Sequence, residues 1–327
     1  MQSVRTLVLA VNDRGGWSVL ALSLGLLLVG SLLPVAQAGH IGCGAILEPG
    51  AVVTLDADVG PCDYGTGDAA IIVRSTAAAP TILDLGGFTV SCPGVTPSPV
   101  GIWVQGERAK VSNGKVSGCA DGVFVEGTGK HTLEKLTVEG NGQSGLYLSV
   151  SPSAPNEGNK LAHNTATQNG YGFLIYSEKN TLIGNTASSN RIGGFTIIAG
   201  ENRLVGNTAV NNPCTIPTCE CAGFHISGNK NTLVGNTADS NFGSGFQIRD
   251  VYCGFQAGGH HTLFRNTATN NGGVGIEVFH FNTNNRIVGN TATGNVSGDL
   301  ADYNEDCDDN RWARNTFDTP SPSGCIR

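Results

Sequence analysis

Apolar and polar residues alternate in short runs over most of the chain after about residue 120. Phe173 and Ile175 enclose one residue, and Phe195 and Ile197 enclose another in the same way. A period of two is typical of β-strands, whose side chains point alternately to opposite faces, whereas a helix would need a period near 3.6. The pattern therefore predicts many short strands, each with one buried face.

These runs belong to a repeated phrase. A Gly-apolar-x-Ile run is followed by polar residues and then by Asn-x-Leu-x-x-Asn-Thr-Ala-x-x-Asn, most clearly in residues 172–190, 194–212, 223–241 and 275–295. The spacings between successive copies of the Asn-Thr-Ala asparagine are 21, 22, 29, 30, 24 and 25 residues, with the last copy degenerate. A period just over twenty with insertions indicates a solenoid with coils of about 21–25 residues. The asparagines are Asn164, Asn185, Asn207, Asn236, Asn266, Asn290 and Asn315.

Stacking of these coils predicts an all-β fold with parallel strands. The phrase always returns in the same direction, so copies stacked in register place like residues on like, about 4.8 Å apart. The core is then a column of Phe, Ile, Leu and Ala. Asparagine tolerates left-handed backbone angles and bonds neighbouring backbone groups, so the recurrent asparagines are interpreted as structural ladders at the corners.

The phrase also resembles a known group of proteins. The leucine-rich phrase and the calcium-binding nonapeptide of β-rolls are both absent. Together with Thr81-Ile82-Leu83-Asp84-Leu85-Gly86-Gly87 and the segment from Asp299-Leu300 to Cys325, the repeats resemble bacterial secreted right-handed parallel β-helix proteins, including the NosD-type periplasmic copper-processing family and the pectate-lyase-like superfamily. The resemblance covers roughly residues 40–325. It implies a right-handed β-helix and leaves activity open, because such proteins include lyases, epimerases, hydrolases and proteins without a known reaction.

The N-terminal segment has the form of an export signal. Arg5 and Arg14 precede an apolar run over residues 17–33, and Ala36-Gln37-Ala38 is a small-x-small cleavage site. We interpret residues 1–38 as a signal peptide in preference to a retained anchor, because the run is short for a membrane span. The expected product is a secreted monomer, extracellular or periplasmic, with one domain over residues 39–327: an N-terminal cap and first coils (39–100), regular coils (101–298) and a C-terminal cap (299–327).

Export places the ten cysteines where disulfides persist. We expect Cys43 with Cys62, Cys92 with Cys119, and Cys307 with Cys325. The remaining four surround insertions at residues 213–222 and 250–261. Two disulfides are favoured there over a metal site, because oxidation competes with thiolate ligation. The four are Cys214, Cys219, Cys221 and Cys253.

Composition excludes some partners. The formal charge is −7 and only 14% of residues are charged, so the basic footprint needed for nucleic acid is missing. No membrane partner is expected after signal cleavage. Calcium is the cofactor left open, because Asp302-x-Asn304-x-Asp306 matches the start of an EF-hand loop. It departs at Cys307 and Ala313, so a solvated acidic cap is the preferred interpretation.

The outward residues of the Gly-x-x-Ile strands define candidate function. If Phe and Ile point inward, the residue between them points outward and stacks over successive coils. We expect two exposed columns. The first is Trp103, Phe124, Tyr147, Leu174, Thr196, His225, Gln247 and Glu277, and the second is Gln105, Glu126, Ser149, Tyr176, Ile198, Ser227, Arg249 and Phe279.

Aromatic residues in line with acid-base groups suit an extended polysaccharide. We therefore expect substrate binding at Trp103, Phe124, Tyr147, Tyr176 and Gln247, and catalysis, if the protein is a lyase or epimerase, at His225, Arg249, Asp250 and Glu277. Two alternatives stay open. One is a non-catalytic secreted scaffold. The other is a NosD-like metal-processing accessory using His225, His260, His261 and His280, although the soft ligands expected for copper are missing and no metal site is predicted.

Overall fold

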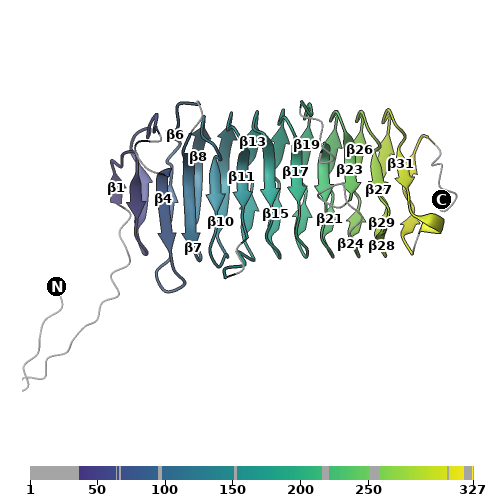
Figure 1. Cartoon of the computed structure of the whole chain (residues 1–327), viewed down its shortest axis with the longest axis horizontal. Coiled ribbons are helices and arrows are strands. Elements are labelled where there is room, and N and C mark those ends of the chain that lie inside the picture. The colour runs from purple at the N-terminus through teal and green to yellow at the C-terminus, as the bar shows by residue number, and fades with distance from the viewer. Residues whose placement is uncertain are drawn as a thin grey trace, which may run out of the picture. The chain divides into compact units, whose positions relative to one another are not determined.

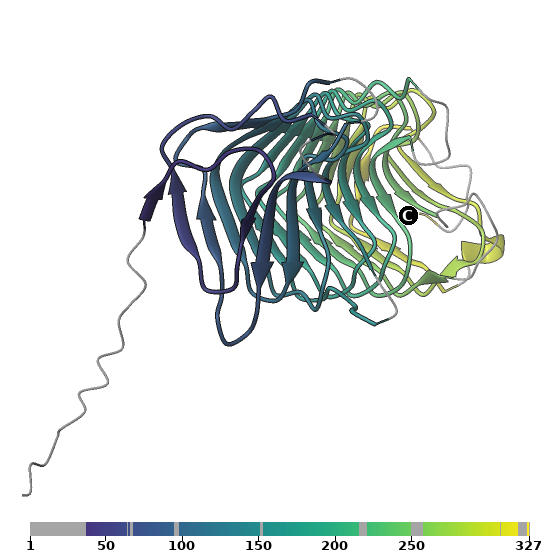
Figure 2. The same cartoon turned by 60° about the vertical axis from the view of Figure 1, so that its left-hand side comes forward.

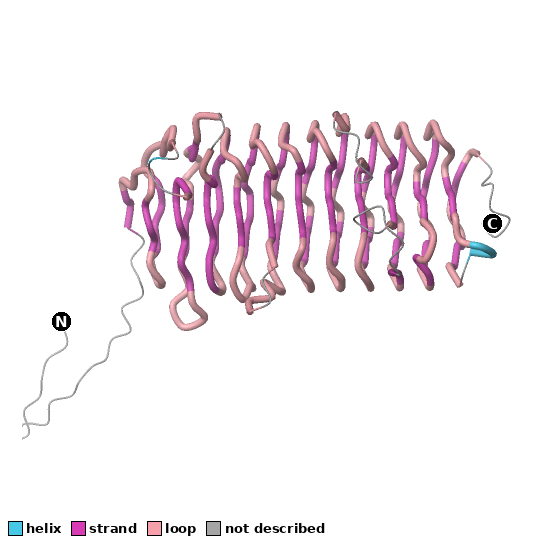
Figure 3. The backbone as a smooth tube through the Cα atoms, viewed as in Figure 1, coloured by secondary structure: helices cyan, strands magenta, loops and turns pink. Residues whose placement is uncertain are grey.

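The computed structural model describes residues 37–63, 65, 68–94, 98–150, 153–215, 221–249, 258–307, 309–319 and 326. The described residues all belong to one compact unit, Pro34–Arg327. This unit is a right-handed parallel β-helix, as predicted. Its coils stack along one axis, with strands on the long sides and loops at the corners (Figures 1 and 3). Within the described residues, no helix is long and apolar enough to cross a membrane.

One side of each coil contributes to an 11-stranded parallel sheet of the described residues. Its strands are β2 (Ala45–Leu47), β4 (Ala69–Ser75), β7 (Val100–Gly106), β9 (Val123–Val125), β11 (Ser144–Leu148), β14 (Tyr171–Ile175), β17 (Gly193–Ile197), β20 (Ala222–Ile226), β23 (Ser244–Ile248), β27 (Ile276–Val278) and β31 (Leu300–Asp302).

The other two sides form a 20-stranded sheet in the described part of the chain, because the long strands β8 and β10 run through both sides. Its strands are β1 (Gln37–Gly39), β3 (Val52–Leu55), β5 (Ile82–Asp84), β6 (Thr89–Ser91), β8 (Lys110–Ser117), β10 (Thr132–Glu139), β12 (Lys160–Ala162), β13 (Thr165–Thr167), β15 (Thr181–Ile183), β16 (Thr186–Ser188), β18 (Arg203–Val205), β19 (Thr208–Val210), β21 (Thr232–Val234), β22 (Thr237–Asp239), β25 (Thr262–Phe264), β26 (Thr267–Thr269), β29 (Arg286–Val288), β30 (Thr291–Thr293), β32 (Arg311–Ala313) and β33 (Thr316–Phe317). Strands β24 (Gly258–Gly259) and β28 (Asn282–Thr283) pair separately, and a 3₁₀ turn, η2, covers Glu305–Cys307.

The core is a stack of identical side chains, enclosed by the coils that Figure 2 shows stacked one behind another. Phe173, Phe195, Phe224 and Phe246 are fully buried, and successive rings lie parallel with centroids 4.6–4.7 Å apart. This spacing is the interval between paired strands, so the in-register repeat itself stacks the rings. The predicted inward direction of these residues is confirmed.

Three asparagine ladders run along the corners. Asn207 is typical: its Oδ1 accepts from the backbone N and the Nδ2 of Asn185, while its own Nδ2 donates to Asn236 Oδ1 and to Leu182 O. The ladder predicted from the Asn-Thr-Ala phrase is confirmed from Asn164 to Asn315. Each amide satisfies backbone groups that would otherwise be buried without partners, so the ladders hold the corners in register.

Disulfides close the coils as the sequence predicted in two places. Cys43 bonds to Cys62 and Cys92 to Cys119. Within the first insertion Cys214 bonds to Cys221. Cys307 is also disulfide-bonded, whereas Cys219, Cys253 and Cys325 lie outside the described residues. The predicted signal-peptide boundary after Ala38 falls inside β1, and residues 1–36 of that segment lie outside the described part.

Candidate functional site

The predicted outward columns exist in register on the 11-stranded sheet. Trp103 pairs with Phe124, Phe124 with Tyr147, and the pairing continues through each coil to Glu277. The second column also lies in register, because backbone hydrogen bonds connect successive coils just past the ends of these strands, for example from Arg249 N to Ile226 O. The two columns differ along their length in what they expose.

The N-terminal half carries a row of aromatic rings. Trp103, Phe124, Tyr147 and Tyr176 touch edge to face, with centroids 6.0, 5.1 and 5.8 Å apart, and all four are half-buried. Edge-to-face contacts of this length hold the rings in place. We call these four residues the aromatic row.

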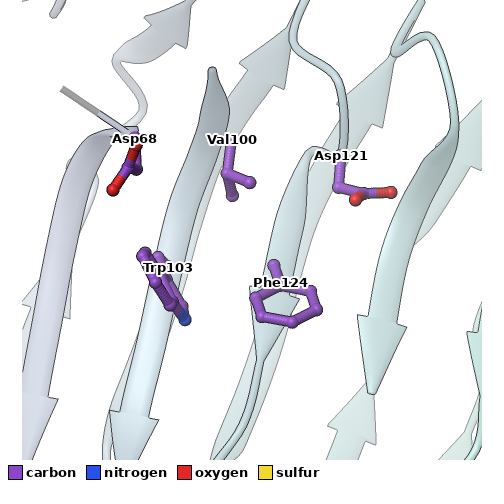
Figure 4. A pocket seen from close by; sticks show the side chains of 5 residues that line it. All are labelled: Asp68, Val100, Trp103, Asp121 and Phe124. Atoms are coloured by element: carbon purple, nitrogen blue, oxygen red, sulfur yellow. The ribbon is translucent and has the colours of Figure 1, made fainter. Parts of the chain in front are cut away.

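A hollow of about 210 Å³ opens beside the row. Figure 4 shows Trp103 and Phe124 along one side of it and Asp68, Val100 and Asp121 along the other. Its volume lies below the roughly 300–1,000 Å³ of pockets that enclose drug-sized ligands, so it suits one ring of a longer chain.

Asp121 is the buried carboxylate of the hollow, whereas Asp68 is exposed. Burial raises the pKa of Asp121, and hydrogen bonds from the side chain and backbone N of Ser144 offset this only in part. Burial and the nearby negative charge of Asp121 also raise the pKa of Tyr147, against a hydrogen bond with Ser149.

Sequence reasoning missed Asp68, Val100 and Asp121. Val100 and Asp121 each precede an outward aromatic residue by three positions, at the start of the strand or just before it. This constant offset from Trp103 and Phe124 is a signal that a search along the repeat would find. Asp68 does not share the offset, because it lies four residues before Ile72, the partner of Trp103.

The C-terminal half of the first column is buried, which corrects the expectation that the whole column is exposed. Thr196 and His225 are completely buried, and Gln247 and Glu277 are nearly so. Gln247 Oε1 lies 3.0 Å from His225 Nδ1, and since a carbonyl oxygen only accepts, Nδ1 donates. Gln247 Nε2 donates to Glu277 Oε1 at 2.9 Å, so the structure brings three predicted site residues into one hydrogen-bonded chain.

Glu277 has further donors around it. Ser244 Oγ donates to Glu277 Oε1 at 2.6 Å, and the Tyr303 hydroxyl also bonds to this carboxyl group. Burial nevertheless raises the pKa of Glu277, because the hydrogen bonds and the charge of Arg249 stabilise the ionised carboxylate less than water stabilises an exposed one. Arg249 itself lies over the Phe279 ring at 4.2 Å, and Tyr303 contacts the same ring. Asp250, the fourth predicted catalytic residue, lies outside the described residues.

The histidines considered for a metal do not converge. His261 belongs to a corner ladder, where its Nδ1 accepts from Asn231 N, while His280 lies against Phe281 and Tyr303. In the part of the chain that the structure describes, no three His, Cys, Asp or Glu side chains are placed to hold a metal ion. In the segment that matches the start of an EF-hand loop, the Asp302 carboxylate accepts hydrogen bonds from Asn304, Asn310 and Trp312. Asp302 and Asn304 are buried, which corrects the expectation of a solvated acidic cap.

Comparison with known proteins agrees with the fold. The family described as right-handed β-helix region matches residues 89–213. No curated protein sequence matches the chain. Among solved structures, the periplasmic alginate epimerase AlgG is 12% identical, with a TM-score of 0.55 over 84% of this chain and 76% of that one. The pectate lyase Pel9A is 15% identical (TM-score 0.53, 85% and 74%). The catalytic unit of a GH87 α-1,3-glucanase from Streptomyces thermodiastaticus is 16% identical (TM-score 0.61, 87% and 63%).

Proposed function

We propose that this protein is secreted and binds an extended polysaccharide along the outward face of the 11-stranded sheet, with the aromatic row as the principal contact. The observation that carries the proposal is the series Trp103, Phe124, Tyr147 and Tyr176 on four consecutive coils. Rings at strand intervals offer apolar faces to successive sugars of a linear chain. The solved structures of similar fold include proteins that act on alginate, pectate and α-1,3-glucan, which supports a polysaccharide as the ligand class.

The hollow beside the row supplies polar contacts for the same ligand. Asp68 is an exposed acceptor for sugar hydroxyls. Asp121, whose pKa burial raises, takes up a proton more readily than an ordinary carboxylate and then both donates and accepts. A pocket wall of carboxyl groups facing aromatic rings matches the alternation of hydroxyls and C–H faces on a sugar.

The test is retention of the full secreted chain on immobilised or gel-embedded polysaccharides, both neutral and uronate-rich. We expect Trp103→Ala and Tyr147→Ala to weaken retention on the polysaccharide. The midpoint of thermal unfolding should fall only by the amount that the loss of packing around each ring explains. Phe242→Ala is the matched control, because Phe242 is an aromatic side chain 68% exposed and outside the row. Equal retention of all variants would refute this site, and absence of any retention would favour the scaffold alternative.

Chemical modification of the bound polysaccharide is a second candidate, favoured by the chain of His225, Gln247 and Glu277 on the same column. Glu277, with its raised pKa, and Arg249 beside it supply an acid and a cation for lyase or epimerase chemistry. New ultraviolet absorbance from unsaturated uronates would identify a lyase, and Arg249→Lys and Glu277→Gln would then be the first variants. If the polysaccharide binds but stays chemically unchanged, the protein is a binder without catalytic activity on it.

A further inference from the structure

Four arginines gather near the C-terminal end of the 20-stranded sheet, on a face that the proposed function does not use. Arg286 and Arg311 are direct partners on β29 and β32. Arg265 and Arg314 follow β25 and β32 at the next corner. All four are exposed. We call Arg265, Arg286, Arg311 and Arg314 the arginine patch.

The patch frames an apolar strip. Phe264, Val288 and Ala313 stack in register between its members. The guanidinium of Arg265 lies 4.8 Å over the Phe264 ring. With strands about 4.8 Å apart, Arg265 and Arg314 lie two strand intervals, or about 10 Å, apart along the axis. The positive charges are therefore spread over a flat surface and do not converge on one point.

Two features of the patch oppose stability. Like charges directly opposite each other on neighbouring strands repel, and Arg286 and Arg311 are such a pair. Arg265 and Arg314 have φ angles of 55° and 56°, in the left-handed region. At the same corner other coils hold glycine, at Gly206, Gly235 and Gly289 among others, or a non-glycine residue in the same conformation, at Lys135 and His163, and each non-glycine residue there costs roughly 1–2 kcal/mol.

Two lysines at the other end of the same sheet form ion pairs with carboxylates. Lys110 pairs with Glu134 at 2.7 Å, and Lys115 with Glu139 at 2.7 Å, each across one strand interval. None of the ion pairs formed between described residues involves a member of the arginine patch. Among the described residues, the four guanidinium groups therefore have no carboxylate within ion-pair distance.

We propose that the arginine patch binds an acidic polysaccharide, with carboxylate groups spaced along a linear chain. Guanidinium groups bond carboxylates with two parallel hydrogen bonds and stack on apolar surface, which suits both the arginines and the strip between them. The formal charge of −7 repels a dense polyanion such as nucleic acid, whereas a uronate chain carries fewer charges per length. This site is separate from the aromatic row, on a different sheet.

The experiment measures affinity for polygalacturonate in the background Trp103→Ala/Tyr147→Ala, so that the aromatic row contributes little. We expect Arg286→Thr and Arg311→Thr each to lower the affinity by roughly tenfold, the value of one charge-assisted hydrogen bond. Threonine is chosen because it occupies this column at Thr232 and Thr262. Methyl-esterified polygalacturonate, which has the same backbone without charge, should bind this background poorly.

Arg203→Thr is the matched control, since Arg203 occupies the same column between Thr181 and Thr232 and outside the patch. We expect it to leave affinity nearly unchanged. An equal loss in Arg203→Thr would show a general charge effect and overturn the site. Duplex DNA bound as tightly as polygalacturonate, and lost in the same variants, would overturn the polysaccharide assignment.

A stability measurement separates this role from a structural one. If binding is the role, Arg286→Thr removes repulsion from Arg311, and the midpoint of thermal unfolding stays equal or rises. A lower midpoint with unchanged polygalacturonate affinity would show that Arg286 serves the fold alone.

Discussion

The Nδ1 atom of His261 accepts a hydrogen bond of 3.1 Å from the backbone N of Asn231, in the place where the next coils along the ladder present the Oδ1 of an asparagine. His131 does the same for Ala109 N at 3.0 Å. An imidazole that accepts at Nδ1 must carry its proton on Nε2 and be neutral. The ladder thus contains two titratable groups that the fold requires uncharged.

We predict that His261 makes the fold sensitive to acid. Burial lowers its pKa to about 3, and burial lowers the pKa of His131 to about 4, against an ordinary value of 6.5. At a pH between the lowered pKa of each histidine and 6.5, the unfolded chain binds a proton that the folded chain does not bind. The free energy of unfolding therefore falls as the pH drops below 6.5. The loss for His261 is on the order of 3 kcal/mol at pH 4.

His261→Asn tests this directly, because asparagine restores the ladder residue without a titratable group. We expect the variant to equal or exceed the original chain in stability at pH 7 and to lose less between pH 7 and pH 4, as measured by urea unfolding at each pH. His163→Asn, at an exposed histidine outside the ladder, should leave the pH profile unchanged. Parallel profiles for the original chain and His261→Asn would contradict the prediction.

The second prediction concerns the aromatic core. Phe195 lies between the rings of Phe173 and Phe224, at 4.6 and 4.7 Å, and is completely buried. Phe195→Ala removes both contacts and leaves a cavity in a stack that cannot close, at a cost of about 3–5 kcal/mol. Denaturant unfolding measures the loss, with exposed Phe242→Ala expected near zero. A cost under about 1 kcal/mol would mean that neighbouring coils collapse into the gap.

The sequence predicted the fold and the registers well, because both follow from local periodicity. The alternation at Phe195-Thr196-Ile197 determines which residue faces inward, and the repeat determines which residue lies beside it on the next coil. Two of the expected disulfides were also predicted correctly, because Cys43 and Cys62, like Cys92 and Cys119, lie about one coil apart in the sequence.

Burial of the outward positions could not be predicted in the same way. Thr196 and His225 point away from the coil interior and are nevertheless buried, because burial there depends on what covers the strand and not on its own pattern. The hollow was missed for a related reason. Asp68 and Asp121 are 53 positions apart in the sequence. They line the same hollow only because each coil, whatever the length of its insertions, returns the chain to the same face.

The third prediction concerns the asparagine ladder. Asn207→Ala removes the acceptor of Asn185 N and Nδ2 and the donor to Leu182 O, all of them buried. Buried polar groups left without partners cost about 1–3 kcal/mol each, so we expect a loss of several kcal/mol in the free energy of unfolding. Asn207→Asp retains the acceptor oxygens and should lose less than Asn207→Ala at acidic pH, where the carboxyl group is neutral. Equal losses in both variants would indicate that the ladder acts through packing alone.

The fourth prediction concerns Glu277. Because burial raises its pKa in the folded chain, the folded form holds a proton that the unfolded form has released above its ordinary pKa. The stability linked to this group is therefore complete below pH 4.5 and is lost as the pH rises through the folded pKa. Glu277→Gln keeps an Oε1 acceptor for Ser244 and Gln247 and carries no charge. We expect it to be more stable than the original chain at neutral pH, with the difference shrinking toward pH 4.

Glu277→Ala distinguishes this titration from a loss of hydrogen bonding. Alanine leaves the Ser244 and Gln247 donors buried without their acceptor, at about 1–3 kcal/mol each, so it should destabilise the fold at every pH. Thermal unfolding of the three proteins from pH 4 to pH 8 measures both effects. If Glu277→Gln gained nothing at neutral pH, the carboxylate would be ionised at no cost in the fold. Glu277 would then be an ordinary base and not the proton donor that modification of a bound polysaccharide requires.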